Sequence, residues 1–218
     1  MKKIGIIGSG IVAKVLGKGL ISLGHSVMLG SREPGKLDDW KAEAGANAQT
    51  GSFREAAAFG EILILAVKGG AAMDALHIAG TETIADKIII DATNPIADAP
   101  PVDGVLQFFT GPNESLMEQL QDAFVQARFV KAFNSVGNAQ MVQPKYAEGA
   151  PTMFICGNDE AARSEVAGII KGLGWDVADM GRAAAARAIE PLCQLWCIPG
   201  FLRNEWTHAF KLLHQQAG

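Results

Sequence analysis

The sequence has little charge and few of the residues that carry acid–base or metal chemistry. Of its 218 residues, 19% are charged, and it contains four histidines, three cysteines and one tyrosine. The 19 basic and 23 acidic residues give a net charge of −4, which indicates neither a basic nucleic-acid surface nor an acidic tail. Three cysteines do not make a disulfide framework and are typical of a reducing compartment. No metal site is predicted.

Long hydrophobic runs are absent as well. Gly5, Gly8 and Gly10 interrupt the apolar N-terminal run, which distinguishes it from the hydrophobic region of a secretion signal. No uncharged stretch reaches the roughly 18 residues that a membrane span needs, and Pro191–Leu202 is among the longest apolar ones. The sequence therefore favours a cytoplasmic protein that binds neither membrane nor nucleic acid.

Glycine, in contrast, is abundant. The chain has 25 glycines and 49% hydrophobic residues, whereas glycine is about 7% of an average protein. The glycines follow no three-residue period, which excludes collagen, and the hydrophobic content excludes a disordered chain. Several fall within the first 35 residues, so glycine is expected to serve turns and close packing there.

Short apolar runs alternate with helical patterns through residue 133. Strands are predicted at 4–7, 26–30, 48–52, 62–67, 87–91 and 128–133, with helices after Gly10 and at 36–46, 53–59, 71–79 and 115–120. This alternation predicts an α/β fold with a Rossmann-type, doubly wound parallel sheet.

The pattern changes after residue 134. Strands are predicted at 152–156 and 175–178, a helix at 160–171, and helix from 183 to the end, broken at Pro199–Gly200. We expect a nucleotide-binding domain over 1–135 and a small α/β extension over 136–218 that packs on it and supplies acceptor-pocket or dimer contacts.

A glycine-rich turn joins the first predicted strand to the first helix. It reads Gly8, Ser9, Gly10, Ile11, Val12 and Ala13, a G-x-G-x-x-A motif. Gly8 permits a tight turn, Gly10 permits close approach of a pyrophosphate, and Ala13 lets helix and strand pack closely. The helix N-terminus then offers free N–H groups to phosphate. The strand–turn–helix context predicts a dinucleotide site.

The end of the second predicted strand indicates which dinucleotide binds. An NAD site usually has an acidic residue here, which bonds the ribose 2′-hydroxyl. This chain instead has Ser31 and Arg32, with Lys36 close behind. Arg32 suits a 2′-phosphate because a guanidinium pairs with phosphate oxygens and stacks on adenine. The predicted cofactor is therefore NADP(H).

Later strand ends are expected at the same crevice, because ligands bind at the carboxyl ends of parallel strands. Backbone at Ala66 and Val67 is expected to line the cofactor path. Asn94 and Pro95 are expected near the nicotinamide ribose, although ordinary turn chemistry explains this pair equally well. Asn134 and Ser135 are candidates to orient a carboxamide or an acceptor, and the preceding buried aspartate, Asp91, is expected to cap its own turn.

No catalytic acid or base is assigned. The histidines do not follow predicted strands, and the single tyrosine, Tyr146, is not part of a Tyr-x-x-x-Lys motif. Hydride transfer between two ring cofactors needs proximity and orientation rather than a strong acid or base, and the sequence suits that reaction.

Five segments together resemble one known family. They are Gly8–Ala13, Gly24–His25, Gly30–Arg32, Val130–Asn134 and Cys156–Asp159. The chain resembles the coenzyme F420-dependent NADP oxidoreductases, and it is also similar to the oxidoreductase domain of the STEAP metalloreductases. The likeness covers nearly the whole chain.

The resemblance implies a homodimeric enzyme with NADPH lying across the strand ends and a flavin-like ring stacked on the nicotinamide. It places Ser9, Ser31, Arg32 and Lys36 on the NADP phosphates, and Ala66 and Val67 against the cofactor. Archaeal members have a histidine-containing segment where this chain has Phe133–Ser135. The expected acceptor is therefore F420 or a flavin (FMN or FAD), and the apolar stretch 192–202 is expected to close the acceptor pocket or to form a dimer contact.

Two other functions remain open on sequence grounds. The first is an NADPH-dependent reductase of a small carbonyl or imine substrate, of the β-hydroxyacid dehydrogenase type, in which Lys131 near a strand end is the proton-donor candidate. The second is a non-enzymatic NADPH sensor. The sequence contains too little beyond residue 134 for the long all-helical domain of the first.

Overall fold

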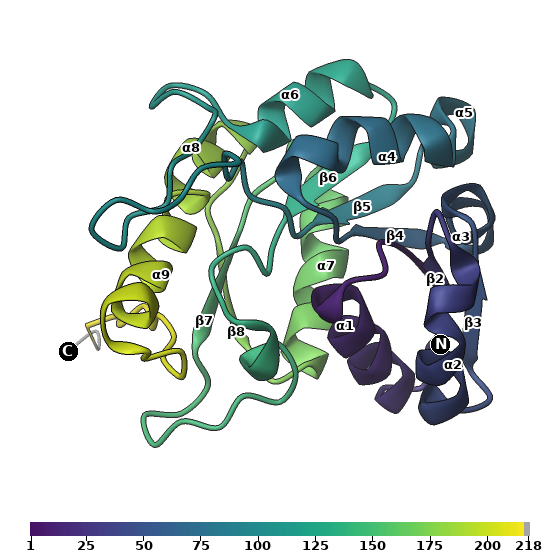
Figure 1. The fold of residues 1–218 in the computed structure, drawn as a ribbon, viewed down its shortest axis with the longest axis horizontal. Helices are drawn as coiled ribbons and strands as arrows, with labels where there is room; N and C mark the ends of the chain where they lie inside the picture. Colours follow the sequence, from purple (N-terminus) through teal and green to yellow (C-terminus); the bar gives the residue numbers. More distant parts are fainter. Residues whose placement is uncertain (216–218) are drawn as a thin grey trace.

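A six-stranded parallel sheet forms the centre of the computed structural model, which describes residues 1–215 (Figure 1). The strands are β1 (Lys3–Ile7), β2 (Ser26–Gly30), β3 (Ala48–Gly51), β4 (Ile62–Leu65), β5 (Ile88–Asp91) and β6 (Arg128–Lys131). Their order is β3-β2-β1-β4-β5-β6, so the direction of winding reverses between β1 and β4. The predicted α/β fold is confirmed, and the reversal marks the point where doubly wound sheets bind ligands.

Helices cover both faces of this sheet (Figure 1). They are α1 (Ile11–Ser22), α2 (Asp38–Ala44), α3 (Phe53–Phe59), α4 (Ala72–Ala79), α5 (Thr81–Ile84), α6 (Leu116–Ala123) and α7 (Glu160–Gly172). Side chains alternate across each strand, so Ile62 and Ile64 pack toward α1 and α7, whereas Leu63 and Leu65 pack toward α4 and α6. Burial on both faces explains why these strands read as continuous apolar runs.

A second, two-stranded parallel sheet follows. It consists of β7 (Thr152–Ile155) and β8 (Asp176–Asp179), joined by α7. An antiparallel bridge between Lys131 and Cys156 joins this unit to the end of β6. The small α/β extension predicted from the sequence is therefore present.

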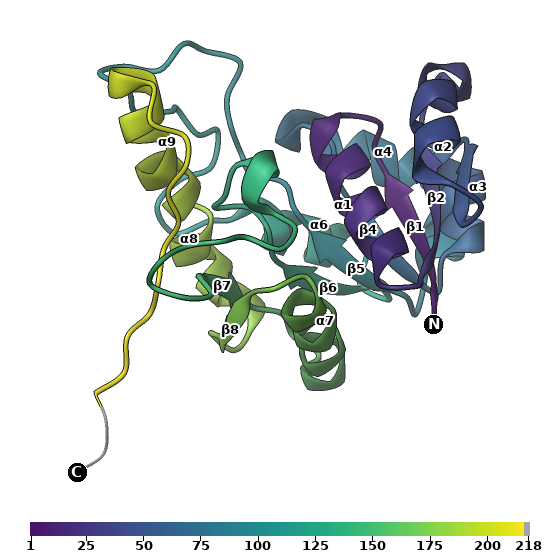
Figure 2. The same cartoon turned by 90° about the horizontal axis from the view of Figure 1, so that it is seen from below.

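The C-terminal prediction was partly wrong. After α8 (Ala186–Ile189), α9 runs from Leu192 to Arg203 and continues through Pro199 instead of breaking there. It ends at Asn204, which adopts a left-handed φ of 57°. The chain beyond is extended (Figure 2); Trp206 packs against Gly200, and the Phe210 carbonyl accepts a hydrogen bond from the Thr152 amide at 2.8 Å. Residues 216–218 of the predicted helical segment lie outside the described residues.

Shorter differences occur at element ends. The predicted helix 36–46 begins as a 3-10 turn at Pro34–Leu37, and the predicted helix 71–79 is α4, preceded by a 3-10 turn at Gly69–Ala71. Another 3-10 turn lies at Asn138–Gln140. A further 3-10 turn, Ala183–Ala185, precedes α8. Within residues 1–215, no helix is both long and apolar enough to cross a membrane.

Candidate functional site

The turn after β1 is built around Gly8. Its φ of +148° lies in the region that side chains disfavour, and a Cβ there would overlap the carbonyl oxygen of Ala66. The Gly8 amide donates to the carbonyl of Gly30, at 3.2 Å. Gly8 therefore brings the carboxyl ends of β1, β2 and β4 together, as its place in the motif predicts.

Gly10 differs from Gly8, because it faces open space. A Cβ on Gly10 would have nothing within 4 Å, and its φ of −76° is available to any residue. Gly10 is also the N-cap of α1, where no side chain accepts a hydrogen bond and no acidic residue lies in the first turn. The first N–H groups of α1 are thus free for a negatively charged ligand, alongside half-buried Ser9 and Val12 and exposed Ile11.

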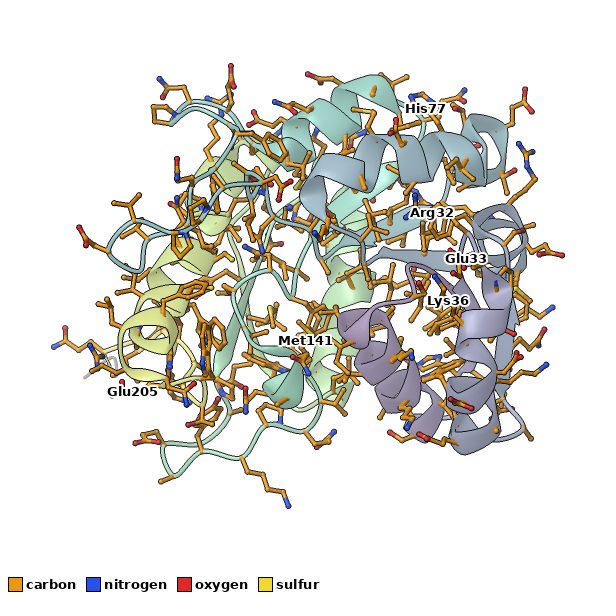
Figure 3. The ribbon with its side chains drawn as sticks, in the orientation of Figure 1. Arg32, Glu33, Lys36, His77, Met141 and Glu205 are labelled. Atoms are coloured by element: carbon orange, nitrogen blue, oxygen red, sulfur yellow. The ribbon has the colours of Figure 1, made fainter. Side chains whose placement is uncertain are left out.

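The end of β2 provides positive charge beside this turn. Ser31 is buried, and its hydroxyl accepts a hydrogen bond from the Glu33 amide at 3.0 Å. Arg32 is exposed, and no ion pair involves it among residues 1–215. Lys36 is exposed too, but it pairs with Glu33 at 2.9 Å. Figure 3 shows these charged residues grouped where the chain enters α2.

Two asparagine side chains meet at the ends of β5 and β6. Asn94 Nδ2 donates to the Asn134 carbonyl at 2.8 Å, and Asn134 Nδ2 donates back to Asn94 Oδ1 at 3.2 Å. The chain bends sharply just before this pair, where Phe133 has a left-handed φ of 62°. The structure therefore brings Asn94 and Asn134 together, with Pro95 and Ser135 buried beside them.

A buried charged cluster lies directly behind this amide pair, and the sequence did not predict it. Lys131 Nζ lies 2.7 Å from Asp91 Oδ2 and 2.8 Å from Glu190 Oε1, and all three side chains are at most 1% exposed. Burial alone would lower the pKa of Lys131, but the two carboxylates outweigh burial and raise its pKa above the ordinary value. Asp91 also caps its own turn, as expected, because Oδ1 accepts from the amide and hydroxyl of Thr93.

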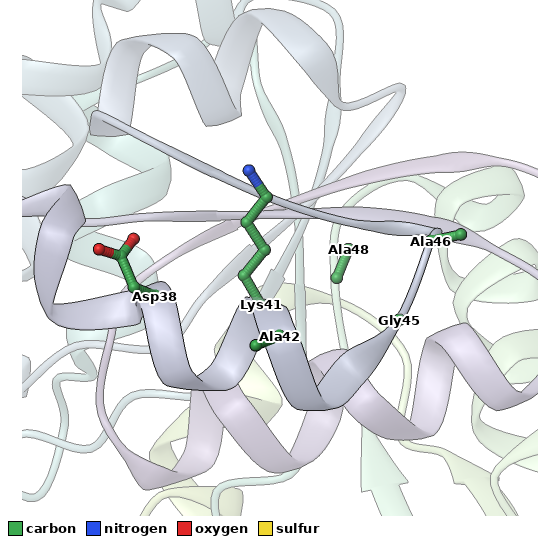
Figure 4. A pocket seen from close by; sticks show the side chains of 6 residues that line it. All are labelled: Asp38, Lys41, Ala42, Gly45, Ala46 and Ala48. Carbon is green, nitrogen blue, oxygen red and sulfur yellow. The ribbon is translucent and has the colours of Figure 1, made fainter.

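Two cavities lie at different distances from these residues. A cavity of about 440 Å³ opens beside α2 and the start of β3, lined by Asp38, Lys41, Ala42, Gly45, Ala46 and Ala48 (Figure 4). It is at the amino end of β3, the edge of the sheet opposite Gly8, and so is not part of the candidate site. A second cavity of about 240 Å³ lies between the 108–114 loop and the residues around Glu190. Among the described residues, no cluster of histidine, cysteine and carboxylate side chains suits a metal ion.

Comparison with known proteins shows the family of the chain. Residues 3–95 match the family model described as NADP oxidoreductase, coenzyme F420-dependent. The crystal structure of a candidate F420-dependent NADP reductase from Arthrobacter sp. FB24 is similar along its full length, with a TM-score of 0.90 and 32% identity over 98% of this chain and 100% of that chain. The chain belongs to the coenzyme F420-dependent NADP oxidoreductase family. It is accordingly an NADP-dependent oxidoreductase with a Rossmann-type fold.

Other family comparisons are partial. Metalloreductase STEAP3 from Rattus norvegicus is 32% identical over 207 residues, 92% of this chain and 39% of that protein, so the chain spans about two fifths of this curated relative. An imine reductase from Streptomyces aurantiacus has a TM-score of 0.67 at 14% identity, covering 92% of this chain and 63% of that chain. At such low identity, the second likeness shows a shared fold and nothing more.

Proposed function

We propose that this oxidoreductase transfers hydride between NADPH and a flavin or deazaflavin ring, such as FMN, FAD or coenzyme F420. The observation that supports NADPH as the cofactor is the position of Arg32 at the end of β2, beside the open N-terminus of α1. The Arg32 guanidinium is exposed and takes part in no ion pair among the described residues. Arg32 and this N-terminus together suit a 2′-phosphate on one side and a pyrophosphate on the other. Ser9, Ser31 and Lys36 add hydrogen-bond donors around the cofactor phosphates. The backbone of Ala66 and Val67 lines the path of the cofactor across the strand ends.

The amide pair supports a nicotinamide at the ends of β5 and β6. Asn134 is 3% exposed, and its Oδ1 has no hydrogen-bond partner among the described residues. A buried acceptor without a donor is costly, and a carboxamide N–H of nicotinamide is the kind of donor it lacks. Asn94, Pro95 and Ser135 would then lie around the nicotinamide ribose and the acceptor.

The state of Lys131 favours hydride transfer between rings over carbonyl or imine reduction. Carbonyl and imine reductases need a proton donor that reaches the substrate. Lys131 is fully buried, donates to the Thr93 carbonyl at 2.9 Å and forms ion pairs with Asp91 and Glu190. Its ammonium group is therefore enclosed by groups of the protein, and it has no proton directed at a substrate.

The cofactor assignment is tested by Arg32→Ala. Losing one charge-assisted interaction, worth about 1.5–3 kcal/mol, should weaken NADPH binding about 10- to 150-fold and leave NADH nearly unchanged. Titration calorimetry measures both dissociation constants. Arg54→Ala is the matched control, because Arg54 lies on α3, is exposed, and is close to Gly80 rather than to the candidate site. Equal losses for NADPH and NADH in Arg32→Ala would contradict the assignment.

The acceptor is tested by NADPH oxidation with F420, FMN, FAD, small keto acids and cyclic imines. We expect turnover with at least one ring acceptor and none with keto acids or imines. Turnover only with keto acids or imines would replace this proposal with the carbonyl or imine reductase. Tight NADPH binding without any turnover would replace it with the sensor.

A ferric chelate belongs in the same panel, since the rat relative is named a metalloreductase. Hydride carries two electrons and a ferric ion accepts one, so iron reduction needs a carrier that passes electrons singly. A flavin does this and a deazaflavin does not. We expect ferric reduction only when FMN or FAD is present.

The assembly is part of the same proposal. Residues 1–135 would hold NADP(H), and residues 136–218 would supply acceptor-pocket and dimer contacts. Leu195, Phe201 and Leu202 on α9 are exposed apolar side chains that suit a homodimer contact. Sedimentation equilibrium of the whole protein measures whether it is a dimer.

A further inference from the structure

The buried cluster of Asp91, Lys131 and Glu190 has a composition that stability alone does not explain. It contains two carboxylates and one ammonium group, and none of the three side chains is more than 1% exposed. Moving an ion out of water costs several kcal/mol, and apolar residues of similar volume often stabilise a fold as well or better. The cluster is therefore a weak source of net stability, and its effect is better sought in what it holds in place.

One arm of the cluster fixes the turn that carries Asn94. Lys131 Nζ donates to the Thr93 carbonyl at 2.9 Å, while Asp91 Oδ1 accepts from the Thr93 amide at 2.9 Å and from its hydroxyl at 2.6 Å. Thr93 is thus held through three groups, immediately before Asn94. Since Asn94 bonds Asn134 in both directions, the turn after β5 and the end of β6 are held in one arrangement.

The other arm reaches the C-terminal helices. Glu190 lies between α8 and α9, and its carboxylate accepts from the amides of Leu116 and Met117 at 2.9 and 3.0 Å, in the first turn of α6. The residue before it, Ile189, accepts a hydrogen bond from Asn134 Nδ2 at 2.9 Å. Lys131 therefore links the strand ends, the start of α6 and the α8–α9 junction from a single buried point.

We propose that Lys131 is a positioning residue that, with Asp91 and Glu190, holds the Asn94–Asn134 amide pair in register with the α8–α9 junction, and so sets the orientation of the nicotinamide. This inference rests on the proposed function. It gives Lys131 no contact with substrate and no proton to transfer. Misplacing a reacting group by about 1 Å costs on the order of 100-fold in rate, so the cluster should affect turnover and stereochemistry more than cofactor binding.

The test uses the whole protein, with wild type measured first. Lys131→Met removes the ammonium group at similar length but leaves two buried carboxylates uncompensated. Glu190→Gln is the gentler variant, because Asp91 and Lys131 remain a neutral pair and the glutamine oxygen can still accept from Met117. Glu118→Gln is the matched control, since Glu118 pairs with Arg187 on the outer side of α6, at 2.7 Å.

Three quantities are measured for each variant: kcat with the preferred ring acceptor, the dissociation constant of adenosine 2′,5′-bisphosphate, and hydride stereospecificity with NADPH deuterated on either face of C4. For Lys131→Met we expect kcat to fall about 10- to 100-fold, deuterium to transfer from both faces, and adenosine 2′,5′-bisphosphate to bind as in wild type. Glu190→Gln should shift kcat and stereospecificity in the same direction by a smaller factor. Glu118→Gln should match wild type.

A merely structural cluster would give a different result. Folded variants with lower thermal stability but wild-type kcat and full stereospecificity would overturn the inference. If Lys131→Met fails to fold, Glu190→Gln decides by the same criteria. If wild type neither binds NADPH nor reduces a ring acceptor, the proposed function is what fails, and the inference fails with it.

Discussion

The two glycines of the β1–α1 turn predict different consequences for the same substitution, glycine to alanine. At Gly10 the added methyl group meets no protein atom within 4 Å, and the backbone angle suits alanine. Replacing such a glycine stabilises a protein by about 0.4–1 kcal/mol, because the unfolded chain loses freedom. Gly10 is also the N-cap of α1, where glycine is preferred to alanine, so the two effects offset one another, and Gly10→Ala should fold normally and melt within a few °C of wild type.

NADPH binding, in contrast, should weaken. If the pyrophosphate occupies the open space at Gly10, the methyl group lies between it and the N-terminus of α1. Forcing an extra carbon into filled space costs about 1–3 kcal/mol, which corresponds to about 5- to 150-fold weaker binding. Gly168→Ala is the control, because Gly168 is exposed inside α7 and also has no atom within 4 Å of an added Cβ. It should raise stability, because alanine is favoured over glycine inside a helix, and leave NADPH affinity unchanged.

Gly8 should behave as a folding position. Its φ of +148° and the overlap of a Cβ with the Ala66 carbonyl would strain alanine whether or not NADPH is bound. Strain and overpacking of about 1–3 kcal/mol each predict a loss of about 2–6 kcal/mol of folding free energy. Thermal melts without and with NADPH, together with titration calorimetry, separate the three variants. A folded Gly10→Ala protein that binds NADPH as tightly as wild type would show that the pyrophosphate does not lie against α1.

Two further predictions concern lysine and cysteine side chains. Lys68 is exposed three residues after the end of β4, so Lys68→Met should retain the wild-type kcat with a ring acceptor, and a large loss in steady-state assays would indicate that Lys68 donates a proton. Burial raises the pKa of Cys156 to about 12, whereas a hydrogen bond from Cys193 lowers the pKa of half-buried Cys197. Because the thiolate is the reactive form, iodoacetamide should label Cys197 first and already at lower pH than an ordinary thiol, with Cys156 unlabelled in the folded protein. Peptide mass spectrometry across a pH series checks the order, and early labelling of Cys156 would contradict it.

The sheet and the β1–α1 turn were predictable because their determinants are local. A strand buried on both faces needs an apolar residue at every position, and Ile62–Leu65 and Ile88–Ile90 show this directly in the sequence. Position 8 likewise requires glycine, because its φ is positive and because a Cβ there would overlap the carbonyl of Ala66. The C-terminal tail was mispredicted because tertiary hydrogen bonds override its helical pattern: the Thr152 amide donates to the Phe210 carbonyl at 2.8 Å, and the Leu212 amide donates to Thr152 Oγ1 at 3.0 Å.

The sequence pattern indicates the buried cluster only in part. Lys131 interrupts the apolar run Phe129–Phe133, and Glu190 follows the apolar residues Ala188 and Ile189. A charged residue within a buried run needs a partner of opposite charge, so each of the two is itself a signal. The sequence does not say that they partner one another, because the chain between them forms β7, α7 and β8 before it returns to the sheet. Opposite charges that each interrupt an apolar run are therefore a pairing hypothesis worth stating before a structure is known, and here the pair stands directly behind the two asparagines expected at the site.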